Sequence, residues 1–173
     1  MLTPSAAAGV LVAWACAVAW MDLRHRRIPN VLSLGGWVVG VSHLLIVGHS
    51  PLGASTSSSW LAAGLALLVT LPGYLLRQLG AGDVKFLVAL GLLSSWPLTL
   101  NSFAIGALLG AAMGWVGHNR PMLLSALPIA WQAPGSWLAR WGASRPAQRH
   151  IPFGAGLTAG LLLGLWLTGL PAP

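Results

Sequence analysis

Long stretches of hydrophobic residues, separated by short polar segments, run along the whole chain. Six of these stretches approach the roughly 20 apolar residues that a helix needs to cross a bilayer. They are residues 5–21, 31–47, 60–76, 84–100, 102–117 and 153–170. The pattern predicts an all-α polytopic membrane protein with about six transmembrane helices. A tight turn around Trp96, Pro97 and Asn101 is predicted to separate the fourth span from the fifth.

The composition agrees with a membrane location. Hydrophobic residues make up 56% of the 173 residues and charged residues only 6%, which is too little charge to cover a soluble domain. The single cysteine, Cys16, excludes an internal disulfide and a CxxC metal site. The first stretch lacks a basic n-region, which predicts a retained span rather than a signal peptide. Residues 1–173 are therefore predicted to form a single transmembrane domain.

All basic residues fall in alternate connections between the predicted spans. They are Arg24, Arg26, Arg27, Arg77, Lys85, Arg120, Arg140, Arg145 and Arg149. Cytoplasmic loops carry the excess of Lys and Arg, so both termini are predicted outside. This topology explains the net charge of +7, and no nucleic-acid partner is expected. Residues 121–150, interrupted by Pro128 and Pro134, are predicted to form a cytoplasmic, partly interfacial connection.

The two acidic residues of the chain lie at predicted cytoplasmic ends of spans. Asp22 closes the first span, and Asp83 opens the fourth. Each has a simple structural explanation, because Asp22 can pair with a neighbouring arginine and Asp83 can be a helix N-cap. However, ionisable groups near the hydrocarbon are costly and tend to mark function. Two acids at similar depth therefore indicate a site.

Two carboxylates in a poorly solvated pocket share a proton and titrate with separated apparent pKa values. The ionised member can activate water while the protonated member polarises a peptide carbonyl, as in aspartic proteases. Gly80 and Gly82 are expected to serve Asp83, through close backbone approach or an unusual backbone dihedral. The basic residues nearby are predicted to limit how far the pKa values of the pair rise.

These residues resemble the motifs of the GxGD aspartic membrane proteases, and more narrowly those of the prepilin peptidases. The matching stretches are Asp22 followed by residues 27–30 (RIPN), residues 80–85 (GAGDVK) and residues 151–154 (IPFG). Within that family, the chain resembles the short form associated with tight-adherence pilus systems. The resemblance implies that Asp22 and Asp83 are the catalytic pair. It also implies a substrate-binding or site-shaping role for Gly80, Gly82, Lys85, Pro29 and Asn30.

The resemblance further implies an endopeptidase of the bacterial inner membrane that cleaves the leader from prepilin or pilin-like precursors at the cytoplasmic face. The substrate would carry a basic leader and a hydrophobic helix. Membrane lipid and a pilus or secretion machinery would be further partners, and no cofactor or metal is expected. Long members of the family have a domain with paired CxxC motifs and methyltransferase activity. This chain lacks those motifs, so methylation is not expected.

The IPFG stretch receives no role from the sequence. Many relatives have a proline where this chain has Ala155, and a proline and glycine at the start of a helix are the simpler interpretation.

Two other classes of function stay open at this point. A small proton- or ion-coupled carrier would also use acids in the membrane, although its site is expected nearer the midplane. A noncatalytic scaffold of a pilus or secretion machine would make both acids dispensable. Cleavage of a leader peptide by the purified protein would separate the three functions.

Overall fold

The computed structural model describes residues 4–126 and 152–168. Within these ranges the chain is helical, with the elements α1 (Pro4–His25), α2 (Asn30–Val47), α3 (Thr56–Leu75), α4 (Ala81–Leu93), α5 (Trp96–His118), α6 (Arg120–Ser125) and α8 (Phe153–Leu167). The helices α1, α2, α3 and α5 are long and apolar enough to cross a membrane, and α8 is a shorter apolar helix. The prediction of an all-α polytopic membrane protein is confirmed. Residues 127–150, which are most of the predicted interfacial connection (121–150), lie outside the described residues.

The bounds of the fourth predicted span, residues 84–100, are wrong. Helix α4 ends at Leu93 and α5 begins at Trp96, so the chain turns at Ser94 and Ser95. The Ser94 hydroxyl donates to the Leu90 carbonyl at 2.7 Å, which satisfies one of the last acceptors of α4. The predicted turn around Trp96 and Pro97 is instead the start of α5, where a proline lacks only an N–H that has no helical partner.

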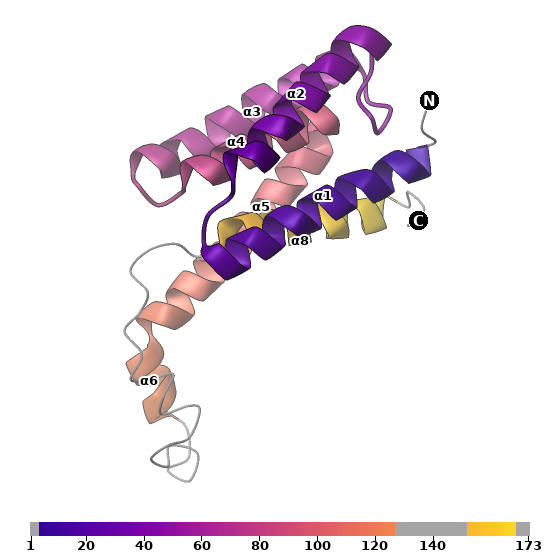
Figure 1. The fold of residues 1–173 in the computed structure, drawn as a ribbon. Helices are drawn as coiled ribbons and strands as arrows, with labels where there is room; N and C mark the ends of the chain where they lie inside the picture. Colours follow the sequence, from indigo (N-terminus) through magenta and orange to yellow (C-terminus); the bar gives the residue numbers. More distant parts are fainter. Residues whose placement is uncertain (1–3, 127–151, 169–173) are drawn as a thin grey trace.

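The helices pack in an order that differs from their order in the sequence. Helix α4 packs between α2 and α3, while α8 packs against α5 and α1. Figure 1 shows α1 beside α8, with α2, α3 and α4 grouped on the other side of the bundle. The Trp14 indole of α1 connects the two groups, because it donates to the Leu32 carbonyl of α2 at 3.1 Å and packs against Phe86 of α4. Helix α1 therefore contacts the α4 group as well as its main partner, α8.

Glycines allow the inner helices to approach their neighbours closely. A Cβ on Gly91 would lie 2.8 Å from the backbone of Ala62, and a Cβ on Gly160 would lie 2.7 Å from the Cα of Ser102. Such small residues are typical of packed helices in membranes, where backbone proximity replaces much of the hydrophobic driving force. These contacts hold α4 on α3 and α8 on α5.

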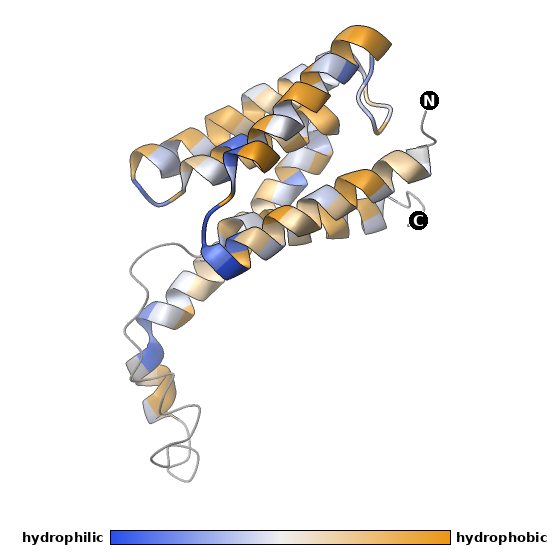
Figure 2. Ribbon diagram, viewed as in Figure 1, coloured by the Kyte–Doolittle hydropathy of each residue, from blue (hydrophilic) through white to orange (hydrophobic). Residues whose placement is uncertain are grey.

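The two connections that carry arginines, α1–α2 and α3–α4, lie at one end of the bundle. Figure 2 shows hydrophilic residues at the α1–α2 and α3–α4 connections, whereas the helices between the ends are largely hydrophobic. The first residues of α1 and the last of α8 lie at the opposite end (Figure 1). Helix α1 ends with Arg26 in the left-handed region at φ 52°, and its N–H donates to the Asp22 carbonyl at 2.8 Å. Asp22 is thus held in the last turn of α1, at the basic end.

The basic end is expected to face the cytoplasm, and cysteine labelling tests this orientation. In a Cys16→Ser background, Ser57→Cys should react with a membrane-impermeant thiol reagent added to intact cells. Gln78→Cys should react only after the membrane is permeabilised. Both positions and the native Cys16 are exposed, so accessibility depends on the side of the membrane. The reverse labelling pattern would place Asp22 and Asp83 on the outer side.

Candidate active site

The two acids of the chain meet between the last turn of α1 and the first turn of α4. Asp22 is 5% exposed and Asp83 is 8% exposed. The charge of Asp22 acts on Asp83 strongly enough to help raise its pKa, so the two groups share one environment. The structure thus brings together the two residues predicted to be catalytic, and their catalytic role stays a prediction.

Asp83 is held by the start of its own helix. The N-cap of α4 is Gly80, whose backbone is extended, and Asp83 is the third residue of the helix. Its Oδ2 accepts a hydrogen bond from the Gly80 N–H at 3.1 Å. The interpretation of Asp83 as the N-cap is therefore wrong, because the side chain reaches back to the cap from inside the first turn. A carboxylate is favoured there, since the helix dipole is positive at the N-terminus.

The first turn of α8 is a third part of the site, which the sequence did not reveal. The Ala155 N–H donates to Oδ2 of Asp22 at 3.2 Å. The Gly154 N–H lies close enough to Asp83 to lower the pKa of its carboxyl group. The first N–H groups of a helix have no partner within it and can therefore bind anions. The informative feature of IPFG was that a helix begins after Pro152. The first N–H groups of that helix have no acceptor within it, so they can donate to a carboxylate.

Gly82 and Gly154 leave room for Ile28 of the α1–α2 connection. A Cβ on Gly82 would lie 3.0 Å from the Ile28 Cβ, and a Cβ on Gly154 would lie 2.9 Å from Ile28 Cδ1. The Gly154 Cβ would also lie 3.1 Å from Oδ2 of Asp22. The expectation of an unusual dihedral at Gly82 is wrong, since Gly82 lies in α4 and has no positive φ. Because Gly82 has no side chain, it leaves space for Ile28.

The remaining predicted residues connect α4 to α2. The Lys85 ammonium donates to Oδ1 of Asn30 at 3.0 Å, and the Trp37 indole donates to the Lys85 carbonyl at 2.8 Å. Asn30 is the first residue of α2, and Pro29 is its N-cap. These bonds fix the start of α2 to the start of α4. They hold the connection that carries Ile28 beside the carboxylates.

Burial raises the pKa of Asp83 from its ordinary value of 3.8 to about 7, and the charge of Asp22 adds to the increase. Asp83 lies outside the four helices long enough to span a membrane. The groups that lower its pKa are the backbone N–H groups of Gly80 and Gly154. For Asp83, the prediction that basic side chains limit the increase in pKa is therefore wrong. The arginines of the α1–α2 connection are exposed, whereas the two amides lie against the carboxyl group.

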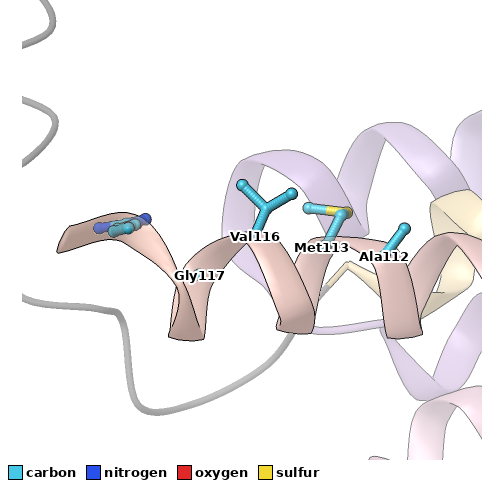
Figure 3. A pocket seen from close by; sticks show the side chains of 5 residues that line it. Ala112, Met113, Val116 and Gly117 are labelled. Atoms are coloured by element: carbon cyan, nitrogen blue, oxygen red, sulfur yellow. The ribbon is translucent and has the colours of Figure 1, made fainter. Parts of the chain in front are cut away.

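No group of three or more His, Cys, Asp or Glu side chains in residues 4–126 and 152–168 could hold a metal ion, and the expected absence of a metal cofactor stays a prediction. A cavity of about 290 Å³ lies on α5 and α6, as Figure 3 shows. It is lined by Ala112, Met113, Val116, Gly117 and Arg120. Neither carboxylate lines this cavity, so it is separate from the candidate site.

A scan against protein families matches residues 9–115, more than half of the chain, to the type IV leader peptidase family. The chain belongs to this family. It is therefore a membrane-embedded peptidase, and the matched region contains both acids. Comparisons with curated proteins and with solved structures found no match. The match to the leader peptidase family ends before α8. The amides of Gly154 and Ala155 therefore lie outside the matched region, and their place beside the carboxylates is seen only in the structure.

Infrared spectroscopy can follow the Asp83 proton in this leader peptidase family member, because the chain has only two acidic side chains. We expect a protonated carboxyl band to persist above pH 4, where an ordinary aspartate is ionised, and to disappear as the pH rises through about 7. A raised pKa keeps the proton on Asp83 over this interval. Asp83→Asn should remove the band. A wild-type band that disappears near pH 4 would contradict the shift.

Proposed function

We propose that this protein is an aspartic-type endopeptidase that removes the leader from prepilin or pilin-like precursors. The reaction takes place at the cytoplasmic face of the bacterial inner membrane, with both termini of the enzyme outside. The meeting of the only two acidic side chains at one buried site supports this proposal most strongly. Family membership provides peptide hydrolysis, and a carboxylate pair provides a chemical mechanism for it.

In the proposed reaction, the ionised carboxylate takes a proton from water as the water oxygen attacks the scissile carbonyl. The protonated carboxyl group donates a hydrogen bond to the carbonyl oxygen, which becomes negative in the tetrahedral intermediate. The C–N bond then breaks, and the carboxyl group that took the proton from water passes it to the leaving nitrogen. The raised pKa of Asp83 favours it as the protonated partner near neutral pH. Asp22, which accepts the Ala155 N–H, is then the base.

The substrate is proposed to present a glycine before the scissile bond. Ile28 occupies the space beside Gly82 and Gly154, and both carboxylates are buried. A segment that reaches them must be extended and without a bulky side chain next to the bond, and glycine meets this requirement. Gly80 and Gly82 carry no side chain that would obstruct such a segment on the Asp83 side.

The basic leader cannot be recognised mainly through salt bridges. Both acids of the chain are engaged in the proposed reaction, and no third acidic residue exists to pair with a lysine or arginine. The hydrophobic helix of the substrate is proposed to pack laterally against the membrane-spanning helices, several of which expose large apolar side chains. Anionic lipid headgroups attract the leader and the basic end of the enzyme alike. A pilus or secretion machinery that supplies the precursor is a further proposed partner.

The two alternative functions have no observation of their own in their favour. Asp22 and Asp83 lie at helix ends, at the same end of the bundle as the basic connections, rather than midway along the spans as a carrier site would. A scaffold function gives no reason to bury both acids together. Membership of a peptidase family supports catalysis over either alternative.

Replacement of either acid tests the proposed chemistry. Asp22→Asn and Asp83→Asn should each lower cleavage of a purified precursor in detergent by about 10³-fold or more, because one carboxyl group cannot serve as both acid and base. Thr70→Val is a matched control, since Thr70 is also buried and polar but bonds within its own helix. It should retain activity. Substantial turnover by either Asn variant, with normal insertion, would refute the assignment.

Neutral substitution of the basic residues in the leader tests how the substrate is recognised. We expect cleavage to be nearly unaffected in uncharged detergent and reduced in anionic liposomes, because the lipid rather than the protein attracts the leader charge. Initial rates for wild-type and neutral leaders in both media provide the comparison. A large loss in detergent would show that the protein itself binds the leader charge.

A further inference from the structure

The first turn of α8 contacts Asp22 in two ways. The Ala155 N–H donates to Asp22 Oδ2 at 3.2 Å, and Gly154 leaves the space in which that oxygen lies. A Cβ at residue 154 would stand 3.1 Å from Oδ2 and 3.4 Å from Cγ of Asp22, closer at the oxygen than side chains normally approach. The contact therefore depends on a backbone donor and on the lack of a side chain beside it.

Other bonds fix the position of α8 along α1. The buried Thr158 hydroxyl lies 3.1 Å from the Ala15 carbonyl of α1 and 3.0 Å from the Gly154 carbonyl. The Phe153 ring packs edge-on against Phe103 of α5, with centroids 6.2 Å apart. Thr158 therefore connects the first turn of α8 to α1 two turns before Asp22, and Phe153 anchors the same turn to α5. A shift of α8 along α1 would separate the Ala155 amide from Asp22.

We infer that the first turn of α8 is a positioning element for the carboxylate pair, in which the Ala155 amide fixes Asp22 and Gly154 leaves the space that this contact needs. This role rests on the proposed function and extends the site beyond residues 9–115, the region matched to the family. It is inferred for this chain and not for the whole family, because a relative with a proline at this position has no N–H to donate there. The amide does not touch the substrate in this arrangement. It sets the orientation of Asp22 toward Asp83 and toward the attacking water of the proposed reaction, and a misplaced base slows proton transfer.

Proline at residue 155 removes the donor selectively. The first hydrogen bond within α8 runs from the Gly156 N–H to the Pro152 carbonyl, so the Ala155 N–H has no acceptor inside the helix. A proline is tolerated in the first turn for this reason. Residue 154 is a glycine, which lacks the Cβ that would clash with the proline ring. Ala155→Gly is the matched control, because it loses the methyl group but keeps the N–H.

We expect Ala155→Pro to lower kcat for precursor cleavage by about tenfold, with little change in KM and a displaced pH–rate profile. Tenfold corresponds to the loss of about 1.4 kcal/mol, within the range for a hydrogen bond to a charged group. Ala155→Gly should lose much less activity and keep the pH–rate profile. An Ala155→Pro enzyme with the wild-type kcat and profile would overturn the inference, as would equal losses in the two variants.

A second pair of variants covers the case in which Ala155→Pro does not fold. Gly154→Val should displace Asp22 and lower kcat, whereas Gly64→Val adds the same side chain to α3, where nothing lies within 4 Å, and should leave activity unchanged. The infrared carboxyl band gives a readout without turnover, and its position should change in Gly154→Val but not in Gly64→Val. An unchanged band together with normal cleavage by Gly154→Val would refute the positioning role.

The outcomes for this inference and for the proposed function are separable. A wild-type protein that does not cleave any leader precursor contradicts the proposed function. A wild-type protein that cleaves, together with α8 variants that match it in kcat, pH–rate profile and infrared band, contradicts only the positioning role.

Discussion

The burial of two carboxylates among apolar helices is the constraint that organises this protein. An ionised group away from water is costly unless hydrogen-bond donors replace the lost hydration, and a second carboxylate alongside increases the cost. The structure provides these donors from helix starts, with Gly80 at α4 and with Gly154 and Ala155 at α8. Both helices must therefore begin at the depth where α1 ends. Both helices are also shorter than the four helices that can span the membrane.

The sequence predicted the helical class and the pairing of the acids because both depend on simple patterns. Apolar runs of nearly bilayer length predict spanning helices. Asp22 and Asp83 were conspicuous because the chain has no other acid. The break at Ser94 was harder to predict, since two serines barely interrupt the apolar run from Val84 to Leu100. Pro97 was the better signal, because a proline near a helix end more often starts a helix than interrupts one.

The parts of the site that were missed are made by backbone atoms and by space. A backbone N–H is present at nearly every residue, so no residue type identifies the Ala155 donor; only the start of α8 beside Asp22 does. Likewise, the need for Gly154 and Gly82 depends on the position of Ile28, which comes from a distant part of the chain. Basic side chains seemed suited to balance the acids, yet the groups that lower the pKa of Asp83 are the backbone N–H groups of Gly80 and Gly154. These contacts depend on which segments lie side by side in the folded chain, and the sequence pattern alone does not show this.

The place of α8 in the chain has a consequence for biosynthesis. Asp22 and Asp83 are made and inserted with the first helices, whereas the amides of Gly154 and Ala155 arrive with the last described helix. A nascent chain that has inserted α1 to α5 holds both acids but lacks two of the donors that keep them in place. Under the proposed function, proteolytic competence is coupled to the completion of membrane insertion.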